Sequence, residues 1–261
     1  MSSNKSVLST SNLSIGYQSK KEKNIIAENL NLTFEHGKLI SLVGGNGIGK
    51  STLLRTLTGI QKPLSGTVLL NNKNISSYQS IDLAQNLSLV LTEKLPPSNL
   101  SVFELIALGR QPYTNWLGKL SAEDLDKIND AISLTHTEHL IDKKNYEISD
   151  GQLQIVLIAR AIAQDTAVII LDEPTTHLDL HHKVSVFKLL KKLSQETNKS
   201  ILFSTHDIDL AIQVSDEMIV MTESSVEQDQ PCNLITKGVF NSLFKDSSIT
   251  FDGKKGKFVI N

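Results

Sequence analysis

The stretch that decides the fold is Gly44-Gly45-Asn46-Gly47-Ile48-Gly49-Lys50-Ser51, which fits the pattern G-x-x-x-x-G-K-[ST]. It follows an apolar run at 39–43, which predicts a buried strand. It precedes residues 51–57, whose three leucines share one face of a helix. A glycine-rich turn in this context lets several backbone N–H groups point at one anion, and the helix start adds its positive dipole end. The pattern therefore predicts a phosphate-binding loop.

Two side chains of this loop suit a bound nucleoside triphosphate. Lys50 can reach the β- and γ-phosphates, and the Ser51 hydroxyl can be offered to Mg²⁺. The alternative is a glycine-rich turn without a ligand. The strand before the loop and the helix after it favour the phosphate interpretation.

A second strand ends in two acids. The aliphatic run at 168–171 leads directly into Asp172 and Glu173. A buried strand delivers such residues to the carboxyl edge of a parallel sheet, where ligands bind. One carboxylate there can hold Mg²⁺, usually through water, and the next can orient and deprotonate an attacking water. Many strands end in aspartate, so it is the combination with the phosphate loop that indicates nucleotide hydrolysis.

Short aliphatic runs alternate with helical periodicity along the chain, which predicts an α/β fold with a largely parallel sheet. The pattern becomes helical between residues 95 and 163, so a helical insert separates the phosphate loop from the acids. At the end of the chain, two short runs at 250–251 and 257–260 predict a hairpin.

Composition excludes several classes of protein. The 261 residues are 39 % apolar and 21 % charged, which excludes disorder of the whole chain. The 26 basic and 28 acidic residues leave no basic footprint of the kind that nucleic-acid binding requires. Cys232 is the only cysteine, which excludes an intrachain disulfide and favours a reducing compartment. We expect no secretory signal and no membrane-spanning helix, because the N-terminal residues are mostly polar and the aliphatic runs are short.

The motifs taken in order resemble those of the ATP-binding cassette (ABC) ATPases, and the resemblance covers nearly the whole chain. After the phosphate loop come Ile148-Ser149-Asp150-Gly151-Gln152, then Asp172-Glu173-Pro174, then Thr176-His177-Leu178-Asp179, then Ser204-Thr205-His206. The resemblance implies one ABC ATPase domain over residues 1–261. It has a P-loop NTPase core with a mainly parallel sheet (about 1–92 and 165–261), an N-terminal antiparallel β part and a helical subdomain (about 93–164).

The most specific of these motifs is the signature segment, Ser149, Asp150, Gly151 and Gln152. Its S-x-x-Q spacing alone predicts a capping box that opens an apolar helix. In the family this helix start faces the γ-phosphate bound by a second copy of the cassette. Asp150 stands where the family usually has glycine, and we expect its acid to turn away from a triphosphate.

The resemblance also implies roles for single residues. Glu173 matches the catalytic base, His206 the histidine that bonds the γ-phosphate and positions the water, and Asp179 the loop that communicates across the dimer. ATP binding is implied for Tyr17, which stacks on adenine, for Thr52, which bonds the α-phosphate, and for Gly44, Gly45, Asn46, Gly47, Ile48, Gly49, Lys50 and Ser51.

The implied cofactors are ATP and Mg²⁺, the latter held by Ser51 and Asp172. Thr92 stands where the family usually has a glutamine that touches Mg²⁺ and senses the membrane partner. A threonine hydroxyl can approach Mg²⁺ through water but is shorter. We therefore do not assign the coupling role of that glutamine to Thr92.

Residues 100–113 and 238–244 resemble the branch that powers uptake of ferric siderophores, haem and cobalamin. This implies a peripheral ATPase subunit on the cytoplasmic face of the membrane. Its partners would be a second copy of itself, integral membrane permease subunits and, indirectly, a substrate-binding protein, but no nucleic acid. The alternatives are an exporter or lipoprotein-release cassette, a non-transport cassette, and a weakened regulatory cassette suggested by Thr92 and Asp150.

The helical insert is expected to carry the surface that docks on the permease. Arg110, Tyr113, Trp116 and Leu117 form a mixture that is enriched at protein interfaces. The alternative is that these aromatic side chains pack inside the insert.

Overall fold

The structure is a computed structural model of the 261-residue chain and describes residues 6–19, 22–91, 96, 98–243, 248–253 and 255–260. Its central element is a six-stranded sheet in the order β11-β10-β4-β9-β8-β7. The five strands from β10 to β7 run parallel, and β11 is antiparallel at the edge. The strands are β4 (Leu39–Gly44), β7 (Leu87–Val90), β8 (Val168–Leu171), β9 (Ser200–Ser204), β10 (Glu217–Met221) and β11 (Val226–Asp229).

Helices cover this sheet and explain why its inner strands are buried and mostly apolar. Every residue of β4, β8 and β9 is buried, as expected for parallel strands covered on both faces. The helices are α1 (Lys50–Leu57), α2 (Ser80–Ala84), α3 (Val102–Ala107), α4 (Ala122–Thr135), α5 (Asp150–Ala163), α6 (Leu180–Glu196), α7 (Ile208–Val214) and α8 (Pro231–Thr236). The predicted α/β fold with a mainly parallel sheet is confirmed.

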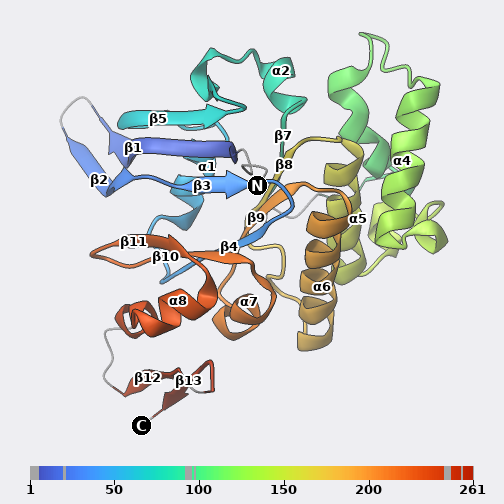
Figure 1. The fold of residues 1–261 in the computed structure, drawn as a ribbon. Helices are drawn as coiled ribbons and strands as arrows, with labels where there is room; N and C mark the ends of the chain where they lie inside the picture. Colours follow the sequence, from blue (N-terminus) through green and yellow to red (C-terminus); the bar gives the residue numbers. More distant parts are fainter. Residues whose placement is uncertain are drawn as a thin grey trace, which may run out of the picture.

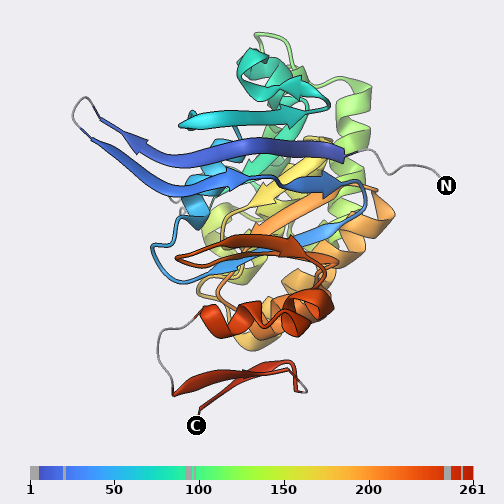
Figure 2. The ribbon, with the colours of Figure 1, turned by 60° about the vertical axis from the view of Figure 1, so that its left-hand side comes forward.

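A second, antiparallel sheet lies beside the first (Figures 1 and 2). Its order is β2-β1-β5-β6, and β3 also pairs with β1. The strands are β1 (Ser6–Gln18), β2 (Lys23–Leu30), β3 (Thr33–Glu35), β5 (Ser65–Leu70) and β6 (Lys73–Asn74). The antiparallel N-terminal part is confirmed. The predicted terminal hairpin is also present, as β12 (Ile249–Asp252) and β13 (Lys257–Ile260).

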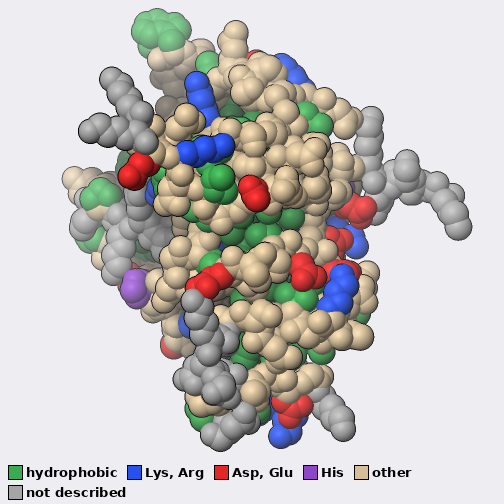
Figure 3. All heavy atoms as spheres, turned by 90° about the vertical axis from the view of Figure 1, so that its left-hand side faces the viewer, with side chains coloured by type: hydrophobic (Ala, Val, Ile, Leu, Met, Phe, Trp, Pro, Cys, Tyr) green, Lys and Arg blue, Asp and Glu red, His purple; other side chains and the backbone are tan. Residues whose placement is uncertain are grey.

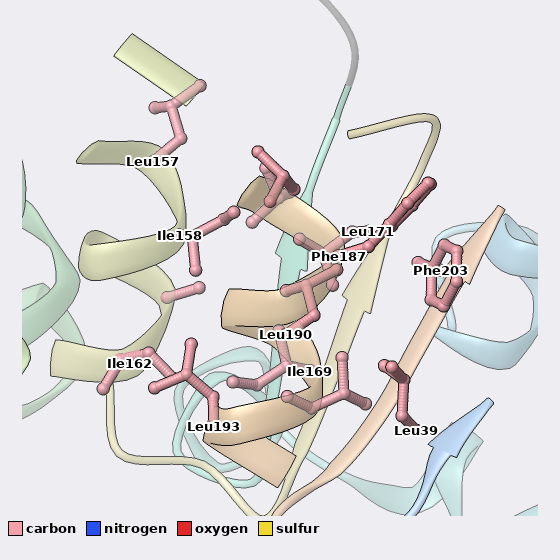
Figure 4. Close-up of a cluster of buried hydrophobic side chains, with 14 of the residues drawn as sticks. Leu39, Leu157, Ile158, Ile162, Ile169, Leu171, Phe187, Leu190, Leu193 and Phe203 are labelled. Atoms are coloured by element: carbon pink, nitrogen blue, oxygen red, sulfur yellow. The ribbon is translucent and has the colours of Figure 1, made fainter. Parts of the chain in front are cut away.

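The main core lies between the parallel sheet and the helices around it. Ile158 and Ile162 of α5, Leu190 and Leu193 of α6, and Ile169 of β8 belong to this one buried cluster, part of which is drawn in Figure 4. Helices α3, α4 and α5 come between β7 and β8 in the chain and form a group of their own on one side of the molecule (Figure 1).

The helix start predicted at Ser149 is confirmed, and α3, α4 and α5 each begin with a capping box. Every helix in the described part of the chain is too short or too polar to cross a bilayer. On the face shown in Figure 3, acidic and basic side chains are interspersed among neutral ones.

Candidate functional site

The register of the parallel sheet brings the predicted motifs to one edge. Leu42 of β4 lies opposite Ser204 of β9, and Leu171 of β8 lies opposite Phe203 of the same strand. The three strands therefore end side by side. The segments that follow them are the glycine-rich loop, the acidic pair and the turn that carries His206.

The loop adopts a backbone that requires glycine at two positions. Gly49 has a φ of 111° and precedes α1, and an added Cβ would lie 2.3 Å from the Cγ2 of Ile26. Gly44 meets β10 so closely that a Cβ would lie 2.7 Å from the carbonyl oxygen of Met221. A larger residue at either position would push the loop out of place.

The Lys50 side chain lies inside the loop. Its Nζ donates to the carbonyl oxygens of Gly44 (2.9 Å) and Gly45 (3.1 Å). Burial lowers the pKa of Lys50, and the charges of Glu173 and Asp172 oppose this shift. The ammonium therefore interacts with the acidic pair while lying within the loop.

A cavity of about 270 Å³ opens beside the loop; we call it the nucleotide cavity. Its walls are formed by Tyr17, Ile26, Asn46, Gly47, Gly49, Lys50, Ser51, Thr52, Glu173 and His206. Gly44, Gly45, Asn46 and His206 line an adjoining cavity of about 190 Å³. The Tyr17 hydroxyl lies 3.0 Å from the Thr52 Oγ1, so the predicted adenine and α-phosphate contacts are neighbours.

Ser204 joins the two acids and is a site residue whose role the sequence did not suggest. Its buried hydroxyl donates to Asp172 Oδ1 (2.7 Å) and accepts from the backbone N–H of Glu173 (2.8 Å). Only the pairing of β8 with β9 shows that Ser204 stands next to the acids.

The Glu173 carboxylate is held at both oxygens. Oε1 lies 2.6 Å from His206 Nε2, and Oε2 accepts from the Thr176 hydroxyl (3.0 Å). The backbone of Glu173 is in the left-handed region, with a φ of 48°. A residue other than glycine keeps this backbone conformation only when its surroundings impose it. Such residues cluster at functional sites. The arrangement places a carboxylate and an imidazole together on the wall of the nucleotide cavity.

The signature segment begins α5 as predicted. The Ser149 hydroxyl accepts from the Gln152 N–H (3.2 Å), and the Gln152 side chain accepts from the Ser149 N–H (3.0 Å). Asp150 is exposed, and Asp179 caps α6. Of the described residues that line the nucleotide cavity, none belongs to the signature segment and none is Asp179. Thr92 lies outside the described residues.

Comparison with known proteins identifies the family. The model of the family described as "ABC transporter" matches residues 27–176, more than half of the chain. The iron(3+)-hydroxamate import ATP-binding protein of Bacillus subtilis is 35 % identical over 96 % of this chain and 92 % of its own.

Solved structures agree with this match. One, described as an inward-facing conformation of a metal-chelate type ABC transporter, has a TM-score of 0.79 and 29 % identity over 92 % of this chain and 89 % of that one. A dimeric bacterial ABC transporter cassette has a TM-score of 0.72 and 27 % identity over 86 % and 98 %. The phosphate loop, the paired acids and the signature segment thus occur in a chain with this family's fold. The chain belongs to the ABC transporter family and is one of its ATP-hydrolysing, nucleotide-binding subunits.

Proposed function

We propose that the chain is the ATP-hydrolysing subunit of an importer for a metal chelate such as a ferric siderophore, haem or cobalamin. The observation that carries the ATPase part is the convergence of Lys50, Glu173 and His206 on one cavity. The import part rests on the similarity, over 96 % of the chain, to an iron(3+)-hydroxamate import protein.

The cavity suggests how the reaction proceeds. Tyr17 stacks on adenine, Thr52 bonds the α-phosphate, and the N–H groups of residues 44–49 with Lys50 bind the β- and γ-phosphates. Glu173 accepts a proton from the attacking water, and its two hydrogen bonds fix the direction of the carboxylate. His206 holds Glu173 and positions the water against the γ-phosphate.

The oxygen donors of Ser51 and Asp172 suit Mg²⁺. Within the described residues, no group of three or more His, Cys, Asp or Glu side chains is placed to hold a metal ion. Mg²⁺ would therefore take its other ligands from the nucleotide and from water, which is usual for this ion. Bound there, it would neutralise charge on the β- and γ-phosphates.

We further propose that two copies share each ATP. The signature segment and Asp179 lie away from the nucleotide cavity of their own chain, which supports a role toward a second copy. Residues 93–164 would form a helical subdomain within one ABC domain, with its core at about 1–92 and 165–261. The pair would sit on the cytoplasmic face of the membrane, bound to permease subunits and indirectly served by a substrate-binding protein.

The Glu173→Gln variant tests the shared site. We expect it to bind MgATP but to hydrolyse it about 10²–10⁴ times more slowly, because a positioned general base is lost. The trapped state should be a dimer, which light scattering with and without MgATP would detect. Glu123→Gln, an exposed position on α4, serves as the control. A variant that stays monomeric at saturating ATP would contradict the shared site, and an unchanged rate would contradict the role of Glu173.

Uptake by cells tests the import part separately. Cells that lack this chain should not accumulate radiolabelled iron supplied as a hydroxamate chelate, haem or labelled cobalamin, according to the substrate. If these cells take up all three chelates normally, while the purified chain hydrolyses ATP, another transport class would be favoured.

A further inference from the structure

The imidazole of His182 contacts two segments that are far apart in the sequence. His182 lies in the first turn of α6, where its backbone N–H (2.9 Å) and its Nδ1 (2.8 Å) both approach Oδ1 of Asp179. These hydrogen bonds, the backbone one first, lower the pKa of Asp179, so the carboxylate is held as an anion in a fixed direction.

The other edge of the same ring lies against the signature segment. A Cβ added at Gly151 would stand 2.9 Å from His182 Cδ2 and 3.5 Å from its Nε2. The ring therefore occupies the space that a side chain at position 151 would take. Gly151 itself is buried, in the first turn of α5. This contact gives a physical reason for glycine at position 151 that is separate from the approach of a phosphate.

We infer that His182 is a positioning residue that joins Asp179 to the signature segment, so that the two act as one rigid unit on a second copy of this chain. The inference rests on the proposed function, in which both segments face the ATP site of that copy. A single ring that contacts both limits how far either can shift alone. When the signature segment is drawn toward the partner's γ-phosphate, Asp179 moves with it.

A simpler role for His182 would be to support the cap of α6, because Asp179 is the N-cap residue. Two variants separate these roles. His182→Asn keeps a donor for Asp179 but loses the ring that lies on Gly151. His182→Phe keeps a ring but loses the side-chain hydrogen bond to Asp179. If His182 supported only the cap, the Asn variant would behave like the native protein. If it joins the two segments, both variants are defective.

The experiment measures two equilibria in the Glu173→Gln background, where ATP is bound but not hydrolysed. One is ATP binding by the single chain, which should be unchanged because His182 does not line the nucleotide cavity. The other is MgATP-driven dimerisation, which should weaken at least about tenfold in both variants. His182→Phe loses a hydrogen bond to a charged group, and His182→Asn loses the packing of the ring on Gly151. His181→Ala is the matched control, since this neighbour meets His182 only edge to face and should dimerise normally.

The outcomes distinguish the two proposals. Failure of Glu173→Gln alone to dimerise would refute the shared site. If Glu173→Gln forms a dimer and the added His182→Asn substitution does not weaken it, the coupling is refuted. His182 would then only support the cap of α6. Thermal unfolding of each variant would show whether a weakened dimer reflects an unfolded chain; weakening in a chain as stable as the control supports the coupling.

Discussion

Acidic side chains have different partners and exposure in the nucleotide cavity and in the helical insert. In the cavity, Glu173 and His206 pair at 2.6 Å with their side chains 24 % and 45 % exposed. In the insert, Arg110 and Asp124 pair at 2.8 Å with side chains only 4 % and 5 % exposed. Partly exposed polar side chains can exchange partners for a ligand, whereas a buried ion pair is costly to separate. The side chains of Glu173 and His206 are therefore available for chemistry, whereas the pair of Arg110 and Asp124 maintains the structure of the insert.

This difference corrects one expectation from the sequence. Arg110 was expected on the docking surface, but it is buried, where it also donates to the Ala163 carbonyl (2.9 Å) and stacks on the Tyr113 ring at 3.9 Å. Its acidic partner, Asp124, belongs to the capping box of α4. The alternative, that the aromatic side chains pack inside the insert, holds in part for Tyr113, which lies against Arg110, whereas Trp116 and Leu117 are exposed.

The largest effect on stability is expected from Arg110→Ala. It would leave the Asp124 carboxylate buried without its cation, which typically costs about 3–5 kcal/mol of unfolding free energy. Urea denaturation would measure this, with Lys119→Ala at an exposed position of the insert as the control. A loss below about 1 kcal/mol would mean that the pair is not structural and would remove the contrast with the cavity.

A smaller effect, on binding rather than on folding, is expected from Lys50→Ala. Losing hydrogen bonds from an ammonium to phosphates should weaken ATP binding roughly 10- to 100-fold. The free energy of unfolding should fall less than in Arg110→Ala, because Nζ bonds only two loop carbonyls. Titration with a fluorescent ATP analogue would test this, with Lys62→Ala as the control. Unchanged affinity would contradict the phosphate loop.

The sequence predicted the local elements well because their signals are local. The strand before the loop, the strand that ends in two acids and the capped start of α5 each carry their pattern within a few residues. The contacts that complete the site are not local. Ser204 joins the two acids through strand pairing, and the ring of His182 reaches Gly151 from another helix. Residue types and spacing do not record such distances, so these roles required the fold.

Where the insert meets the core, a pair of salt bridges should make the stability depend on pH. Asp165 follows α5 and accepts from Lys127 of α4 (2.7 Å) and from Lys199 (2.9 Å), which immediately precedes β9. Burial raises the pKa of Asp165, but the hydrogen bonds and charges of the two lysines outweigh it and hold the pKa at about 2.

A lowered carboxyl pKa means that the stabilisation is present above the ordinary value of 3.8 and is lost as the pH falls toward 2. Because the side chain is 37 % exposed, solvent limits the effect to about 1 kcal/mol or less. The stability of Asp165→Asn, measured by denaturation at pH 5 and pH 2.5, should therefore fall less with acid than that of the native chain. An equal loss of stability in the variant and in the native chain would show that protonation of Asp165 does not destabilise the protein.

The smallest effect on stability is expected on the exposed side of the insert. Trp116 is 91 % exposed and Leu117 68 % exposed, so Trp116→Ser should change the free energy of unfolding by less than about 0.5 kcal/mol.

If these residues dock on the permease, the Trp116→Ser variant should keep the ATPase activity of the isolated subunit and lose both substrate uptake and copurification with the permease. Tyr146→Ser, at another exposed aromatic residue of the insert, is the matched control. Cross-linking from a cysteine at position 116, after the exposed Cys232 is replaced by serine, would report the contact directly. Normal uptake by Trp116→Ser would place the docking surface elsewhere, and the insert would then differ from the cavity only in how its charges are buried.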